Sequence, residues 1–122
     1  MNSDPITSAL AQEHFRSRAM FSIGPLELER RLREGEEMVL VDVREVADYA
    51  AGHLPDAICF PKEQWPGGDG LDREVLNVVY CDSHLCHLAS AAAAEFAGRG
   101  YSVVELAGGI EAWKANKLTV ER

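Results

Sequence analysis

Residues 77–100 read NVVYCDSHLCHLASAAAAEFAGRG, and this stretch changes character twice along its length. It opens with an apolar run that is typical of a strand covered on both faces of a parallel sheet. The alanine-rich segment that follows predicts a helix ending at Gly98 or Gly100. Between the two lies a polar loop that begins with Cys81, so this cysteine is placed at the carboxyl end of a predicted strand.

The same alternation continues on both sides of this stretch. Apolar segments that predict further strands are 21–24, 39–41, 57–60 and 102–106, and helices are predicted over 4–20, 25–35, 45–52 and 110–116. Short buried strands that alternate with helices indicate an α/β domain with a parallel sheet and helices on both faces. Ligands of such sheets bind beyond the carboxyl ends of the strands, which makes Cys81 a candidate functional residue.

The first predicted helix carries Ile6, Leu10 and Phe15 on roughly one face. We expect this face to pack on the rest of the domain.

Composition and charge exclude several classes of function. A chain of 122 residues with 47% hydrophobic residues is long enough for one domain with its own core. The net charge of −8 disfavours nucleic acid and anionic membranes as partners. We find neither an apolar run that spans a bilayer nor a signal-peptide pattern, and therefore expect a cytoplasmic protein.

Three cysteines, Cys59, Cys81 and Cys86, are too few for a secreted disulfide framework, so we expect reduced thiols. Apolar neighbours predict that Cys59 is a core residue. Cys81 differs, because a loop that leads into a helix turns backbone amides inward and lowers the pKa of a thiol. No Lys or Arg lies between Arg73 and Arg99, so stabilisation of the thiolate from this segment depends on those amides and on two histidines, His84 and His87.

Three stretches of the chain resemble signatures of the rhodanese-like domain family. They are VLVDVREVADYAAGHLPDAICFP (39–61), VVYC (78–81) and GYSVVELAGGIEAWK (100–114). The resemblance implies an α/β rhodanese-like fold with a central five-stranded parallel sheet and helices on both faces. It assigns residues 21–122 to the rhodanese-like domain and leaves residues 1–20 as an N-terminal helical extension.

The resemblance also implies sulfurtransferase chemistry. Cys81 would take a sulfane sulfur from a small-molecule or protein persulfide donor, hold it as a persulfide, and pass it to a thiol acceptor. The family has Asp42 near the active site and Arg44 in a structural role, and it needs neither a cofactor nor a metal. The cradle for the transferred sulfur would be the loop Asp82, Ser83, His84, Leu85, Cys86 and His87.

The loop departs from the common family pattern in three ways. It lacks the usual Arg-Ser pair, it is about two residues longer, and it has a second cysteine, Cys86, five residues after Cys81. In these respects it is similar to a rhodanese subgroup with two loop cysteines. Loss of the arginine removes a bidentate donor for an anion such as thiosulfate.

Four other interpretations of this loop stay open. Phosphatase chemistry needs an arginine six residues after the cysteine, where this chain has His87. A zinc site would use Cys81, His84, Cys86 and His87, but four ligands from one short loop lack the usual distant second pair. In a redox interpretation, Cys86 attacks a persulfide or sulfenate on Cys81 and forms a disulfide.

In the fourth interpretation the chain is a sensor or binding module with little or no catalysis, and Cys81 and Cys86 would make it redox-responsive. The sulfur donor and acceptor, the oligomeric state and the role of the N-terminal helix are left open by the sequence.

Overall fold

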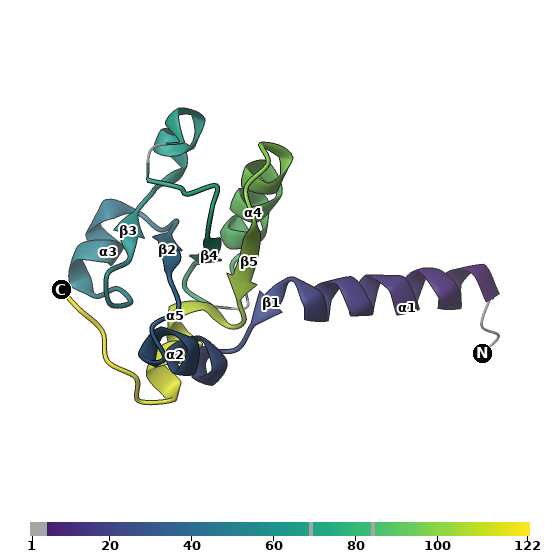
Figure 1. Ribbon diagram of the computed structural model, residues 1–122, viewed down its shortest axis with the longest axis horizontal. Helices are drawn as coiled ribbons and strands as arrows, with labels where there is room; N and C mark the ends of the chain where they lie inside the picture. Colours follow the sequence, from purple (N-terminus) through teal and green to yellow (C-terminus); the bar gives the residue numbers. More distant parts are fainter. Residues whose placement is uncertain (1–4, 69, 84) are drawn as a thin grey trace.

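The computed structural model describes residues 5–68, 70–83 and 85–122 and consists of one sheet with helices on both sides (Figure 1). The elements in chain order are α1 (Pro5–Met20), β1 (Ser22–Ile23), α2 (Pro25–Arg33), β2 (Met38–Asp42), α3 (Val46–Ala51), β3 (Ile58–Cys59), the 3₁₀ helix η1 (Lys62–Gly67), β4 (Leu76–Tyr80), α4 (Leu88–Gly98), β5 (Val103–Leu106) and α5 (Gly109–Ala115).

The sheet has five strands in the order β1-β5-β4-β2-β3, and every pairing is parallel. This confirms the fold class that the sequence predicted. The strand that precedes Cys81, β4, is the central one, and it pairs with β2 over its whole length. Because side chains alternate along a strand, Val78 and Tyr80 enter one core cluster while Val79 and Cys81 enter the other.

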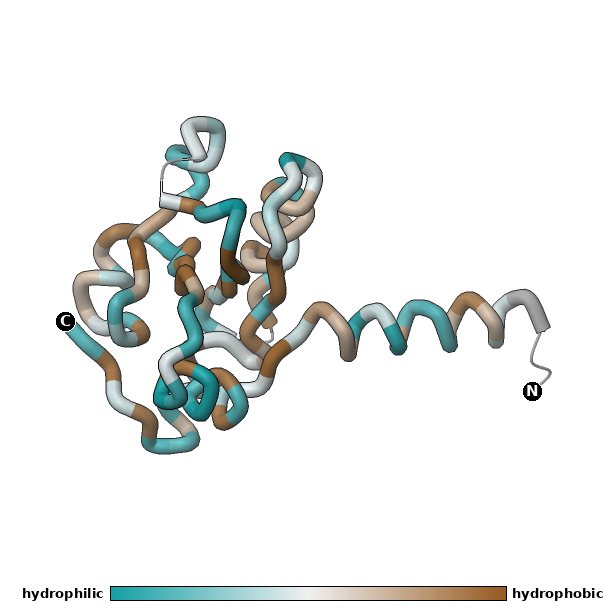
Figure 2. Tube along the Cα trace, viewed as in Figure 1, coloured by the Kyte–Doolittle hydropathy of each residue, from teal (hydrophilic) through white to brown (hydrophobic). Residues whose placement is uncertain are grey.

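Helices cover each face of this sheet with a separate core. On one face α2 and α5 contribute Leu28, Ile110 and Trp113, all of which are buried. On the other face α4 contributes small residues and Phe96, and η1 contributes Trp65. Figure 2 shows the apolar residues gathered within this body. Ala89 and Ala92 of α4 are buried, and their small side chains let the helix pack close to the sheet.

The N-terminal helix α1 projects away from this body (Figure 1). Leu10 is 61% exposed and Phe15 is 60% exposed, so the prediction that their face packs on the domain is wrong. Polar residues separate the apolar ones along α1 (Figure 2), and they therefore form no continuous apolar stripe. The side chain of Ile6 and residues 1–4 lie outside the described part of the chain. The division into residues 1–20 and 21–122 stays a prediction.

A glycine turn before α5 fixes the loop that follows β4. The carbonyl of Cys81 accepts a hydrogen bond of 3.0 Å from the Ile110 N–H, and the carbonyl of Asp82 accepts one of 2.9 Å from the Glu111 N–H. Gly109 has φ +62°, and a Cβ built on it would lie 2.5 Å from the Cys81 oxygen. Only glycine allows this approach of the two main chains.

We predict that Gly109→Ala lowers the free energy of unfolding by about 3 kcal/mol, because the new methyl group adds backbone strain and a clash with the Cys81 carbonyl. Urea denaturation at a fixed redox state measures the change. Gly98→Ala is the matched control, since a Cβ there meets nothing within 4 Å. A Gly109→Ala variant as stable as the control would contradict the close approach.

Candidate functional site

Cys81 follows the central strand directly, and its sulfur is bonded to that of Cys86. The two Cα atoms are 6.4 Å apart, within the usual range for a disulfide. Cys81 is only 3% exposed, whereas Cys86 is partly exposed. In this oxidised form, Cys86 is therefore the sulfur of the pair that an outside reactant reaches more easily.

Two amides of the loop donate hydrogen bonds within the loop itself. The Leu85 N–H donates to Ser83 Oγ at 3.2 Å, and the Cys86 N–H donates to the Ser83 carbonyl at 3.1 Å. In the disulfide-bonded form these two amides do not serve the Cys81 sulfur as the sequence led us to expect. Helix α4 starts at Leu88, two residues after Cys86, so its first amides are nearer in the chain to Cys86 than to Cys81.

The predicted loop residues differ in exposure. Asp82, Leu85 and His87 are exposed, with Leu85 at 75%, and Ser83 is partly exposed. His84 lies outside the described residues. Asp82, Leu85 and His87 therefore point their side chains toward solvent, while Cys81, which precedes the loop, is buried.

A buried ion pair lies at the end of β2, beside the loop. Arg44 donates to Asp42 through Nε (3.0 Å to Oδ1) and Nη2 (2.7 Å to Oδ2), and its own N–H donates to Oδ1 at 3.0 Å. Asp42 is 0% exposed and Arg44 is 6% exposed. Arg44 Nη2 also donates to the Gly52 carbonyl at 2.6 Å, which ties the end of α3 to the pair. Removing either charge would leave the other buried without compensation.

Tyr80 is a member of this network that sequence reasoning missed. Its hydroxyl donates to Asp42 Oδ2 at 2.8 Å and accepts from the Leu54 N–H at 3.1 Å. Burial, reinforced by the charge of Asp42, raises the pKa of Tyr80, so the hydroxyl keeps its proton as a donor. The available signal was a tyrosine in an otherwise aliphatic buried strand, because a buried hydroxyl needs a partner.

The network extends to the loop through Arg44. Its Nη1 lies 3.5 Å from Oδ1 of Asp82, the residue after Cys81. Burial acts to lower the pKa of Arg44, but its hydrogen bonds to Asp42 and the charge of Asp42 outweigh this, and the pKa is raised. The guanidinium therefore stays charged and is shared between Asp42 and the loop. Asp42 and Arg44 thus lie next to the loop after Cys81, and their accessory role in the site stays a prediction.

Cys59 lies on β3, on the other side of β2 from β4. Cys59 is a free thiol and is partly exposed, so its prediction as a core residue is wrong. The reason is that β3 is a two-residue edge strand with a neighbour on one side only. Burial raises the pKa of the Cys59 thiol, and the charge of Asp42 raises it further. His53 Nδ1 is 2.9 Å from the Tyr49 carbonyl, which gives this imidazole a structural partner.

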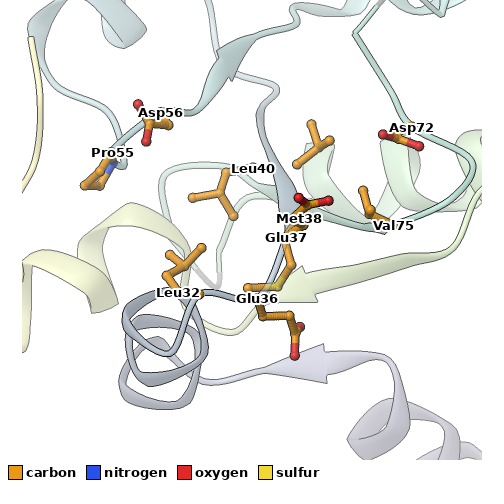
Figure 3. Close-up of a pocket in the computed structure, with 11 residues that line it drawn as sticks. Leu32, Glu36, Glu37, Met38, Leu40, Pro55, Asp56, Asp72 and Val75 are labelled. Carbon is orange, nitrogen blue, oxygen red and sulfur yellow. The ribbon is translucent and has the colours of Figure 1, made fainter.

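A separate hollow lies at the amino ends of β2, β3 and β4, opposite the cysteines (Figure 3). Figure 3 shows four carboxylate side chains around it, from Glu36, Glu37, Asp56 and Asp72. Ligands of parallel α/β sheets bind at the carboxyl ends of the strands, so this acidic hollow lies at the end of the sheet opposite the usual ligand site.

The described residues contain neither a metal-binding cluster nor a membrane-spanning helix. No group of three or more His, Cys, Asp or Glu side chains in this part of the chain is arranged to hold a metal ion. Among the helices of the described ranges, none is long and apolar enough to cross a membrane.

Comparison with known proteins identifies a family over most of the chain. The family described as Rhodanese, rhodanese-like domain, matches residues 25–116. A sulfurtransferase of Allochromatium vinosum is 36% identical over 97 residues, which are 76% of this chain and 87% of that protein. An HTH-type transcriptional regulator of Mycobacterium tuberculosis, Rv0324, is 37% identical over 96 residues, which are 75% of this chain but only 41% of the regulator.

Among solved structures, the BH2092 protein from Bacillus halodurans is similar, with a TM-score of 0.82 and 32% identity. The match covers 93% of this chain and 85% of that one. The family match starts at residue 25, and all residues from there to the C-terminus make up less than 93% of the chain. The structural match therefore also includes part of the region before Pro25.

The disulfide predicts how many cysteines of the unreduced protein react with a thiol reagent. In denaturant without reductant, iodoacetamide should label one cysteine per chain, Cys59, because Cys81 and Cys86 are joined. After reduction it should label all three. Mass spectrometry of the intact protein reads the number of adducts. Three labelled cysteines in protein that was purified and denatured without reductant would contradict the pair.

Proposed function

The chain belongs to the rhodanese-like domain family, and we propose that it is a sulfurtransferase that carries a sulfane sulfur on Cys81. The main support for this proposal is the position of Cys81. It lies at the carboxyl end of the central strand and directly before the loop that Arg44 contacts. The family match and the sulfurtransferase relative support the general class of activity. The persulfide, the donor and the acceptor belong to the proposal.

The reaction needs Cys81 as a free thiolate, so the bond to Cys86 must first be opened by a thiol. The Cys81 thiolate then attacks the outer sulfur of a persulfide donor, RSS⁻. The donor's S–S bond breaks, RS⁻ leaves with the electron pair, and Cys81 becomes a persulfide. An acceptor thiolate attacks the outer sulfur of this persulfide, and Cys81 leaves as the thiolate. Two thiolate displacements at sulfur thus replace one direct transfer from donor to acceptor, and each has a lower barrier. No external cofactor takes part.

The environment of Cys81 suits these displacements in two respects. The hydrogen bond between the Cys81 carbonyl and the Ile110 N–H fixes the main chain, and so the direction from which the sulfur is reached. The ion pair behind the loop holds Asp82 near Arg44 and so restrains the loop's first residue. Once the disulfide opens, the loop amides become free to turn toward the Cys81 sulfur, and in that state the cradle of residues 82–87 would form.

The donor we propose is a small-molecule or protein persulfide rather than thiosulfate. The loop has no arginine to clamp a compact oxyanion, and Arg44 is already engaged by Asp42. We also propose that the chain belongs with the rhodanese subgroup that has a second loop cysteine. A cytoplasmic location fits this chemistry, since thiols that open the disulfide are abundant there.

Sulfur transfer should depend on Cys81 and not on the other two cysteines. We predict that Cys81→Ser abolishes transfer from glutathione persulfide, polysulfide and thiosulfate alike, because the hydroxyl is not a sulfur carrier. Cys86→Ser should keep most of the activity, and Cys59→Ser is the matched control with full activity. The rate of sulfur release to an added thiol is the measurement. Equal loss in Cys81→Ser and Cys86→Ser would require a mechanism that uses both sulfurs.

A second candidate function is a redox-responsive sensor or binding module. The disulfide between Cys81 and Cys86 favours it, and one relative is a transcriptional regulator. Peroxide would oxidise the Cys81 thiolate to a sulfenic acid, and the Cys86 thiol would then form the disulfide and release water. Cys86 could also attack the inner sulfur of a Cys81 persulfide, which would form the same disulfide and release hydrosulfide.

Mild peroxide applied to the reduced protein tests this candidate. We predict that a peptide linked through Cys81 and Cys86 appears, and that Cys86→Ser instead accumulates sulfinic acid on Cys81. Over-oxidation of Cys81 in the unmodified protein, without the linked peptide, would count against it. A disulfide that forms readily in a protein inactive with every donor would favour the module over the enzyme.

A further inference from the structure

A cleft of about 730 Å³ lies between α1 and the loop that carries the cysteines. One wall is the last two turns of α1, with His14, Phe15 and Arg18, and the facing wall includes Cys86 and His87. The floor comes from the ends of β1 and β5 and from the glycine turn, with Ser22, Glu105, Ala107 and Gly108. The helix that projects from the body therefore borders the more accessible sulfur of the disulfide.

The charges of this cleft differ from those of the whole molecule. The chain has a net charge of −8, and the hollow at the opposite end of the sheet is ringed by carboxylates (Figure 3). Among the described residues, those that line the cleft include the guanidinium of Arg18, the imidazoles of His14 and His87, and one carboxylate, Glu105. Glu105 accepts a hydrogen bond of 3.0 Å from Ser90 Oγ. No carboxylate of the described residues forms an ion pair with Arg18.

We propose that α1 supplies the cation that the loop lacks, so that Arg18 binds a carboxylate of a small anionic thiol, or of its persulfide, whose sulfur lies against Cys86. This inference deepens the proposed function. Binding of a persulfide in the cleft rests on that function, whereas binding of a thiol does not. No Lys or Arg lies between Arg73 and Arg99, so a cation at this mouth must come from another element. A guanidinium is well suited to hold a carboxylate.

The size of the cleft indicates the class of ligand. Small-molecule pockets in proteins occupy about 300–1,000 Å³, and this cleft falls within that range. A five-atom oxyanion such as thiosulfate would fill little of it. A thiol attached to a short peptide with carboxylate groups would span from Arg18 to Cys86, and its apolar atoms would meet the exposed ring of Phe15.

The first reaction in this cleft would be the opening of the disulfide. The bound thiolate RS⁻ attacks the Cys86 sulfur, the bond to Cys81 breaks, and Cys81 leaves as a thiolate. A second RS⁻ attacks the mixed disulfide at the ligand's sulfur, which gives RSSR and the Cys86 thiolate. Two thiols are thereby oxidised and one disulfide is reduced. Attack occurs at Cys86 because it lines the cleft, whereas Cys81 is 3% exposed.

The rate of this reduction tests the role of Arg18 in the full-length oxidised protein. Glutathione is the anionic probe and 2-mercaptoethanol the neutral one, and alkylation followed by mass spectrometry counts the opened disulfides. We predict that Arg18→Gln slows reduction by glutathione about threefold to fivefold and leaves the rate with 2-mercaptoethanol unchanged. Arg18→Lys should restore most of the rate. Arg16→Gln, on an exposed part of α1 outside the cleft, should change neither rate.

Three results would overturn the inference. Arg18→Gln reduced by glutathione as fast as the unmodified protein would show that Arg18 binds no carboxylate. Equal slowing with both thiols would indicate a general disturbance of the disulfide. Equal slowing in Arg16→Gln and Arg18→Gln with glutathione would indicate only the overall charge of α1.

The outcome is separable from that of the proposed function. If reduction depends on Arg18 but no donor delivers sulfur to Cys81, the thiol site stands and the sulfurtransferase proposal fails. If sulfur transfer proceeds and Arg18→Gln has no selective effect, the transferase proposal stands and the role of α1 is wrong.

Discussion

The site depends on the contact between two turns, the one that leaves β4 and the one that enters α5. The Cys81 carbonyl accepts a hydrogen bond from the Ile110 N–H, and the absence of a side chain at Gly109 lets the two main chains meet. Because β4 is the central strand and β5 leads into the glycine turn, the sheet itself sets the distance between them. This contact holds the main chain of Cys81, while the disulfide to Cys86 holds its sulfur.

The other side of the loop is held by charge. Asp42 and Arg44 are buried together, with the Tyr80 hydroxyl as a further donor, and Arg44 reaches Asp82 as well. This arrangement separates two roles between two cysteines. Cys81 is restrained and covered, whereas Cys86 is partly exposed. In the proposed cycle this cover would protect a stored sulfur from water, and Cys86 would control when Cys81 is freed. The two proposed functions differ in whether opening the pair starts a catalytic cycle or reports the redox state.

Local patterns predicted much of the fold and the place of Cys81 at the end of a strand. The apolar runs gave the strands, and the change from Tyr80 to a polar loop marked Cys81. The side of the sheet that each helix covers, the hydrogen bonds of Tyr80 and the exposure of α1 depend on contacts between distant segments, which periodicity does not encode. The approach of Arg18 to the loop is likewise a result of where β1 lies beside β5. The contact between Cys81 and Cys86 was a hypothesis from spacing, and only the path of the loop settled its geometry.

The most direct measurement is to locate the transferred sulfur. The reduced protein is incubated with glutathione persulfide, alkylated, digested and examined by mass spectrometry. The account predicts that one added sulfur atom is found on the peptide that contains Cys81, with Cys59 unmodified, and that it disappears when an acceptor thiol is added. An added sulfur found only on Cys86 or Cys59, or on no cysteine while Cys81 is fully reduced, would contradict it.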